Sequence, residues 1–274
     1  MANPYQGWSL DDRDPQFIRS LFPLWDWLYT HYFQVQSEGW EHIPDRNVLF
    51  VGSHNGGLAA PDTHMAMYDW FRRAGCDRLT YGLMHPKAWT VFPELAAIAA
   101  RTGAIRAHPK MAIAALQHQA SVLVYPGGAQ DAFRPHTQRD RIYFAGRTGF
   151  IKLAMRENVP IVPIVSWGAH DTLYIVDDCY KQVKQLHEWG MPWFKGVDPE
   201  VFPIYFGLPW GLGIGPLPNL PLPAPIHLRV GKPIYFEHSG RDALKNQDYV
   251  QTCCNTVIDQ MQQDLDELIT AHPR

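Results

Sequence analysis

His54 is the residue of this sequence whose type and setting most favour catalysis. It follows the apolar segment 48–52 and precedes Asn55, Gly56 and Gly57. An imidazole titrates near neutral pH, and glycines allow the backbone to turn sharply so that the ring stays accessible. We therefore expect His54 to act as a general base that takes a proton from a bound hydroxyl or water. The alternative is a histidine of the core whose ring is satisfied by hydrogen bonds.

Asp62 is the acidic residue that we expect to pair with this histidine. A carboxylate on the second ring nitrogen fixes the tautomer and stabilises the imidazolium that forms when the base takes a proton. Asp62 also lies between Pro61 and Thr63, where a helix is expected to begin, so a helix-capping role is the alternative.

A second glycine turn, of sequence Pro-Gly-Gly at 126–128, follows the apolar segment 121–125. Backbone N–H groups of such a turn approach phosphates or developing oxyanions. Arginines follow the turn at positions 134, 139, 141 and 147. Their charge suits an anionic part of a substrate, and a solvated basic face is the alternative.

Several catalytic motifs are missing from the sequence. It has no GxSxG nucleophile elbow, no GxGxxG turn at a first strand and no GxxxxGK[ST] loop, which disfavours α/β-hydrolases and nucleotide-binding folds. It also has no HExxH and no ladder of histidines and cysteines, so we expect no metal site. Without an obvious protein nucleophile, the predicted base is expected to act on a hydroxyl of a substrate or on water.

Positive charge is concentrated in one stretch of a slightly acidic chain. The net charge is 24 − 27 = −3, whereas residues 101–156 hold nine Lys or Arg and two acidic residues, a local excess of +7. We interpret this stretch as a docking surface for an anionic partner. A nucleic acid is not expected, because its partners are basic over the whole domain.

Predicted strands and helices alternate along a chain of ordinary globular composition, 46% hydrophobic and 19% charged. Apolar segments predict strands at 48–54, 79–84, 121–128, 159–165 and 226–234. Helical spacing predicts helices at 63–73, 91–101, 110–119, 149–157 and 242–270. This alternation predicts a single α/β domain with a largely parallel central sheet flanked by helices. Ligands of such sheets bind beyond the carboxyl ends of the strands, where His54 and the second glycine turn lie.

Two segments have the apolar character of membrane-binding surfaces. Residues 15–33 predict an amphipathic helix rich in Trp and Tyr, with a break near Phe22 because Pro23 follows. Residues 201–226 carry no charged side chain, and their seven prolines and four glycines argue against a continuous helix. For both segments, packing on the core and contact with lipid are the alternatives.

These features predict how the chain is organised and where it works. We expect an N-terminal helix in residues 1–34, docked on the core or on a membrane, and a catalytic domain in residues 35–274. Neither a signal peptide nor a transmembrane helix is expected, so the predicted location is cytoplasmic and peripheral at the membrane.

Taken in order, the segments resemble the glycerolipid and lysophospholipid acyltransferase superfamily, with its PlsC-like fold, and within it the monoacylglycerol/diacylglycerol acyltransferase-like branch. The matching blocks within residues 32–234 are VLFVGSHNGGLAAPD, LMHPKAWTVFPELAAIAARTGAIRAHPKMAIAAL, SVLVYPGGAQDAF with GRTGFIKLAMRENVPIVPIV, and LPLPAPIHLRVGKPI. Three features depart from the usual pattern. Asp62 stands eight residues after His54 instead of five, the turn at 126–128 lacks the glutamate of lysophosphatidate acyltransferases, and Gln-Asp at 130–131 replaces a frequent Arg-Glu pair.

The resemblance implies an O-acyltransferase that moves a fatty acyl group from acyl-CoA or acyl carrier protein to a lipid hydroxyl, with no tightly bound cofactor. It implies that His54 is the general base and Asp62 its partner. The residues implied to bind substrates are Asn55, Gly56, Gly57, Pro126, Gly127, Gly128 and Arg134. The basic stretch would then meet the phosphates of CoA, the acidic surface of acyl carrier protein or anionic lipid headgroups.

The Pro-Gly-Gly turn favours a neutral acceptor, such as a mono- or diacylglycerol or a long-chain alcohol. The alternatives are a lysophosphatidate or lysophospholipid acyltransferase, a catalytically silent lipid-binding protein on the same fold, and a hydrolase that uses water as acceptor.

Overall fold

The computed structural model describes residues 5–193 and 196–273; residues 1–4, 194, 195 and 274, which the predicted domain ranges include, lie outside the described residues. The central sheet has seven strands in the order β1-β10-β6-β2-β5-β3-β4. They are β1 (Gln36–Glu38), β2 (Leu49–Gly52), β3 (Thr80–Met84), β4 (Ala104–Arg106), β5 (Ser121–Val124), β6 (Ile161–Trp167) and β10 (His227–Val230). Only the β10–β6 pair is antiparallel within the described sheet. The predicted α/β class with a largely parallel sheet is confirmed.

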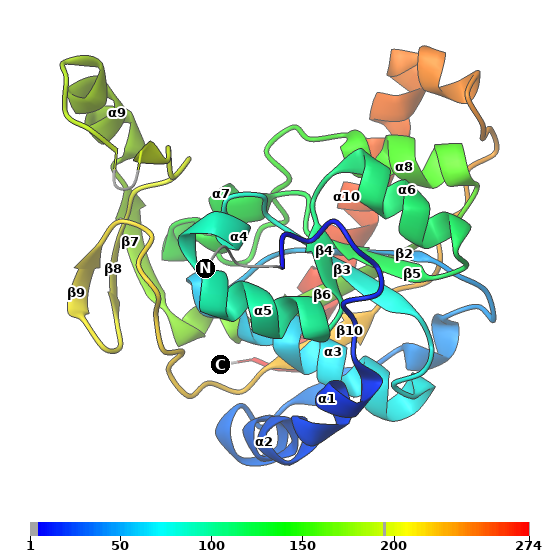
Figure 1. Ribbon diagram of the computed structural model, residues 1–274, viewed down its shortest axis with the longest axis horizontal. Helices are drawn as coiled ribbons and strands as arrows, with labels where there is room; N and C mark the ends of the chain where they lie inside the picture. Colours follow the sequence, from blue (N-terminus) through cyan, green and yellow to red (C-terminus); the bar gives the residue numbers. More distant parts are fainter. Residues whose placement is uncertain (1–4, 194–195, 274) are drawn as a thin grey trace.

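Helices cover both faces of this sheet (Figure 1). α1 (Pro15–Ser20), α2 (Phe22–Trp27) and α3 (Pro61–Ala74) pack on one face, and α6 (Pro109–Gln117), α8 (Gly149–Glu157) and α10 (Gln247–Ala271) pack on the other. Side chains of β2 alternate between the two cores: Phe50 joins the first, and Leu49 and Val51 join the second. A strand buried on both faces has no polar alternation, which is why β2 is a continuous apolar run.

The predicted strands all form, and the helices differ mainly at their ends. The helix expected at 91–101 is divided into α4 (Ala88–Val91) and α5 (Pro93–Arg101), because Pro93 has no N–H with which to continue the first helix. α10 begins at Gln247 and not at residue 242, because the side chain of Asn246 caps it by accepting the N–H of Tyr249.

The N-terminal helix breaks near Phe22 as predicted. α1 ends at Ser20, α2 begins at Phe22, and a π-helical turn over Leu28–Tyr32 follows. Rings and aliphatic groups of this region are buried beside α3: Ile18, Trp25, Tyr29 and Phe33. Core packing therefore accounts for most of its apolar surface, although Leu24 and Trp27 remain exposed.

A second sheet projects from the domain, and the sequence patterns did not predict it. β7 (Tyr174–Asp178), β8 (Pro203–Gly207) and β9 (Gly211–Ile214) are antiparallel, and α9 (Tyr180–Glu188) extends beyond them (Figure 1). We call these four elements the arm. Among the described residues, no helix is both long and apolar enough to cross a membrane.

Candidate active site

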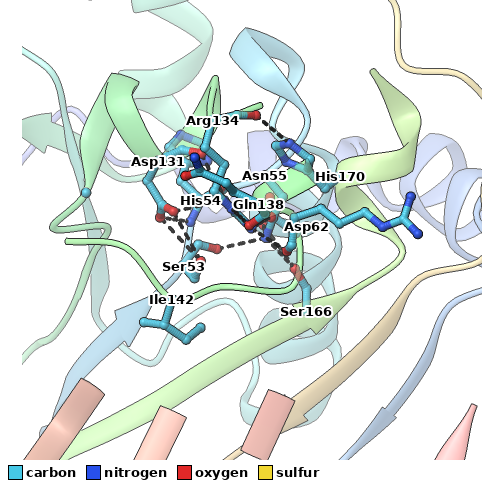
Figure 2. A network of polar contacts seen from close by, with 12 residues as sticks. Ser53, His54, Asn55, Asp62, Asp131, Arg134, Gln138, Ile142, Ser166 and His170 are labelled. Carbon is cyan, nitrogen blue, oxygen red and sulfur yellow. Dashed lines mark hydrogen bonds and ion pairs between the residues drawn. The ribbon is translucent and has the colours of Figure 1, made fainter. Parts of the chain in front are cut away.

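The predicted catalytic segments meet at one edge of the central sheet. β2 leads into His54, β5 leads into the turn at 126–128, and β6 carries Ser166 near its end. β2 lies between β5 and β6, and all three strands are parallel. Their carboxyl ends therefore lie side by side. Figure 2 shows His54 and Asn55 near Ser166, and Asn55 Nδ2 donates to Ser166 Oγ at 2.8 Å.

The backbone of His54 is held on both sides. Its N–H donates to Asp131 Oδ2 at 2.5 Å, and its carbonyl oxygen accepts from Arg134 Nη1 at 2.8 Å. The same guanidinium nitrogen lies 2.8 Å from Asp131 Oδ1, so the two partners form a buried ion pair (Figure 2). We call this pair the clamp, because it fixes the peptide groups from which the imidazole projects.

The N–H groups of Arg134 donate to acceptors inside the protein. Besides its contacts to His54 and Asp131, it donates to Asn55 Oδ1 at 2.5 Å and to the carbonyl oxygens of Gln138 and Arg139. Its side chain is only 3% exposed. These contacts do not support the expected role of Arg134 in binding an anionic substrate; they support a positioning role.

Asp62 faces Asn55, and not the ring of His54. Its Oδ2 accepts from Asn55 Nδ2 at 3.0 Å and from Ser166 Oγ at 3.2 Å, and its Oδ1 accepts the N–H of Thr63 at 2.7 Å. His54 Nδ1 is buried and has no hydrogen-bond partner among the described residues. The expected ring-to-carboxylate pair is therefore not formed in this arrangement. Asp62 instead belongs to the network that runs through Asn55 to the clamp.

Burial dominates the electrostatics of the site. It raises the pKa of Asp62 to about 6 and that of Asp131 to about 7, against the opposing effect of their hydrogen-bond donors and of Arg134. Burial, and then the charges of Arg134 and His64, lower the pKa of His54 to about 4. The imidazole is therefore neutral at physiological pH, which is the state that accepts a proton.

Tyr125 packs on the imidazole, and the sequence patterns did not single it out. The ring centroids of Tyr125 and His54 lie 4.8 Å apart. A Cβ at Gly52 would lie 2.3 Å from the tyrosine ring, so only glycine leaves room for this packing. A glycine at the end of an apolar strand was the available signal, because it marks a close approach.

The turn at 126–128 is held by its carbonyl groups. Arg147 Nη1 donates to the carbonyl oxygens of Pro126 at 3.0 Å and Gly127 at 2.5 Å. A Cβ at Gly127 would lie 2.2 Å from the carbonyl oxygen of Tyr143. The N–H of Gly128 donates to the Tyr125 carbonyl, whereas that of Gly127 has no acceptor within the described chain. One backbone donor of the turn is therefore available.

The glycines after His54 are secured by a distant segment. Gly56 and Gly57 have φ of +75° and +67°, a region that favours glycine. Asn219 Nδ2 donates to the Gly56 carbonyl, and its Oδ1 accepts the N–H of Ala59, both at 3.2 Å. Asn219 was not among the predicted site residues, since nothing in its local sequence indicates this contact.

The basic stretch is largely neutralised by acidic side chains, most of them from outside it. The ion pairs are Arg101–Asp14 at 2.8 Å, Arg134–Asp131 at 2.8 Å, Arg139–Asp171 at 3.7 Å, Arg147–Glu200 at 3.8 Å and Arg156–Glu157 at 3.0 Å. In the described part of the chain, four cations of the stretch have no ion pair: Arg106, Lys110, Arg141 and Lys152. An anionic docking surface stays a prediction, and it would depend chiefly on these four. No group of His, Cys, Asp and Glu among the described residues is arranged to hold a metal ion.

Comparisons with known proteins give this geometry its context. The family model described as diacylglycerol acyltransferase matches residues 12–268. An uncharacterized protein of Mycobacterium tuberculosis is 28% identical over 232 residues, which cover 81% of this chain and 58% of that protein. Diacylglycerol O-acyltransferase 1 of Saccharomyces cerevisiae is 31% identical over 129 residues, 47% of this chain and 30% of the yeast protein.

The chain thus spans little more than half the length of the mycobacterial relative. Among solved structures, the 1-acyl-sn-glycerophosphate acyltransferase PlsC from Thermotoga maritima aligns with a TM-score of 0.49 and 17% identity. The alignment covers 93% of this chain and 79% of that one.

Proposed function

The chain belongs to the diacylglycerol acyltransferase family, and we propose that it is an O-acyltransferase that moves a fatty acyl group from acyl-CoA or acyl carrier protein to a lipid hydroxyl. One observation carries the proposal: His54, a neutral and half-buried imidazole, is held by both of its backbone groups at the carboxyl edge of the sheet. A base must be unprotonated and correctly placed before it can act, and the clamp supplies the placement.

The proposed reaction is a direct transfer. His54 takes the proton of the acceptor hydroxyl as its oxygen attacks the thioester carbonyl, forming the new C–O bond. The tetrahedral intermediate then breaks the C–S bond, and the imidazolium returns its proton to the departing thiolate. We assign stabilisation of the oxyanion to the N–H of Gly127, which has no acceptor among the described residues, because a fixed backbone dipole stabilises developing charge without reorganisation.

Asp62 and Arg134 enter this proposal as positioning residues. Asp62 holds Asn55, Asn55 accepts from Arg134, and Arg134 holds the carbonyl of His54. Any loosening along this chain of contacts displaces the imidazole. Misplacement by about 1 Å costs about 10²-fold in rate.

The acceptor that the geometry favours is neutral. Arg134 is the first cation after the turn at 126–128. Its guanidinium donates to groups inside the protein and is buried, so it is not available to bind a phosphate. We therefore propose a mono- or diacylglycerol or a long-chain alcohol as acceptor. One assay that offers labelled lysophosphatidate, monoacylglycerol, diacylglycerol and phytol in parallel tests this, and a clear preference for lysophosphatidate would contradict it.

His54→Ala is the decisive variant for the chemistry. Loss of a general base is expected to slow transfer to the verified acceptor about 10²–10⁴-fold. The variant should melt close to the wild type, because the clamp binds only backbone groups of residue 54. Unchanged transfer by a folded variant would show that His54 is not the base.

Two measurements address the remaining alternatives. A silent lipid-binding protein would consume no acyl-CoA above background with any acceptor. A hydrolase would release free fatty acid when no alcohol is present.

A further inference from the structure

The arm presents an exposed apolar face on the outer side of its sheet. Cross-strand register places Tyr174 beside Phe206 and Phe206 beside Leu212, with Ile214 next along β9. These four side chains are 50–56% exposed. The opposite side of the sheet is buried, because Tyr205 and its neighbours pack into a core of their own. An apolar row of this kind, open to solvent, marks an interaction surface.

The apolar face continues past β9 toward the catalytic loop. Trp210 and Leu220 are 52% and 59% exposed, and Leu220 pairs through its backbone with Leu208 at the β8–β9 hairpin. Asn219, the neighbour of Leu220, holds the loop that follows His54. The segment that carries Leu220 therefore connects the arm to the loop that follows His54. We call Phe206, Trp210, Leu212, Ile214 and Leu220 the arm surface.

The N-terminal helices add to the same region. The hydroxyl of Tyr32 donates to the carbonyl of Pro221 at 2.8 Å, and the ring of Trp27 lies 5.8 Å from that of Tyr32. Trp27 is itself 51% exposed. The two segments that the sequence marks as membrane-like thus meet in space.

We propose that the arm surface docks on a lipid bilayer through apolar contact, an inference that rests on the proposed transfer to a lipid. Residues 201–226 contain no charged side chain, and a bilayer excludes charge whereas protein interfaces carry a polar rim. Trp at the border of an apolar surface is typical of membrane interfaces.

Vesicle flotation tests the docking without any substrate. The wild type is expected to float with phosphatidylcholine vesicles at low and at high salt, because apolar contact is not screened. Leu212→Ser combined with Ile214→Ser should lower the partition coefficient about tenfold or more, since both side chains would lose their contact with lipid. The matched control is Leu95→Ser with Ile98→Ser on α5, which removes a leucine and an isoleucine of similar exposure and should float like the wild type.

Three results would overturn the proposal: a wild type that does not float, a Leu212/Ile214 variant that floats as well as the wild type, or equal losses in both double variants. Light scattering adds a fourth, a wild-type dimer that the arm variant converts to a monomer without any vesicle binding. Thermal melting confirms that each variant folds, and Phe206→Ser on the adjacent strand serves if the double variant does not. Because flotation needs no turnover, flotation without acyl transfer would count against the proposed function alone.

Discussion

Asp131→Asn is the substitution that most directly tests the clamp on His54. The carboxylate accepts with both oxygens, Oδ1 from Arg134 and Oδ2 from the His54 N–H. An asparagine keeps the shape and supplies only one acceptor, so its NH₂ group must face one of these two donors. Arg134, only 3% exposed, also loses its counter-charge.

The expected loss of stability follows from that burial. Removing one partner of a buried ion pair costs about 3–5 kcal/mol. For a chain of this size, each kcal/mol lowers the melting temperature by about 2–4 °C, so we expect a fall of roughly 6–20 °C. The comparison belongs at pH 8, because the pKa of Asp131 is raised to about 7. Below that pH the folded wild type binds a proton that the unfolded chain does not, so the wild type gains stability and the variant does not; the difference in melting temperature should therefore persist at lower pH.

Thermal unfolding and initial rates measured on the same samples complete the test. The rate should fall about 10²-fold even at temperatures where the variant is folded, because the imidazole is displaced. Gln130→Ala, its exposed neighbour on α7 (Gly128–Ala132), is the control and should change neither quantity. A folded Asp131→Asn protein with wild-type melting and wild-type rate at pH 8 would refute the clamp.

Two further predictions concern the base and the turn. Because the pKa of Asp131 is raised to about 7 and that of His54 is lowered to about 4, kcat/KM should fall in two steps, first near pH 7 as the clamp loses its carboxylate and again near pH 4–5 as the base is protonated. Asp131→Asn should lack the upper step, and an upper step that persists in this variant would show that His54 itself titrates near pH 7. Gly127→Ala should destabilise the protein by about 1–3 kcal/mol and slow transfer, since its Cβ would lie 2.2 Å from the Tyr143 carbonyl. Gly149→Ala, where a Cβ meets nothing within 4 Å, should be neutral or slightly stabilising by denaturant unfolding, and equal effects of the two substitutions would contradict the steric argument.

The local sequence alone was enough to predict features that depend only on residues adjacent in the chain. The apolar run of β2 and the glycines after it were enough to place His54 at a strand end. Pro23 was enough to predict the break between α1 and α2, because a proline lacks the N–H that a continuous helix needs. The alternation of strands and helices predicted the α/β class, because it too is visible in the local sequence.

The partners of His54 were decided only by the tertiary structure. Asp131 and Arg134 lie about 80 residues beyond it, and the order of the strands brings them to its backbone. The orientation of the Asp62 side chain also depends on the tertiary structure. Ser166, which lies on β6, and Asn55 both donate hydrogen bonds to the Asp62 carboxylate.

In the arm, too, the sequence determined one property and the tertiary structure another. The composition of residues 201–226 excluded a spanning helix, yet the prolines and glycines that did so also hid the two strands inside it. Pairing with β7 creates the sheet, and pairing alone decides which side chains turn inward with Tyr205 and which face outward with Leu212. Sequence determines the apolar character of such a segment; only the strand register, set by distant partners, determines which face carries it.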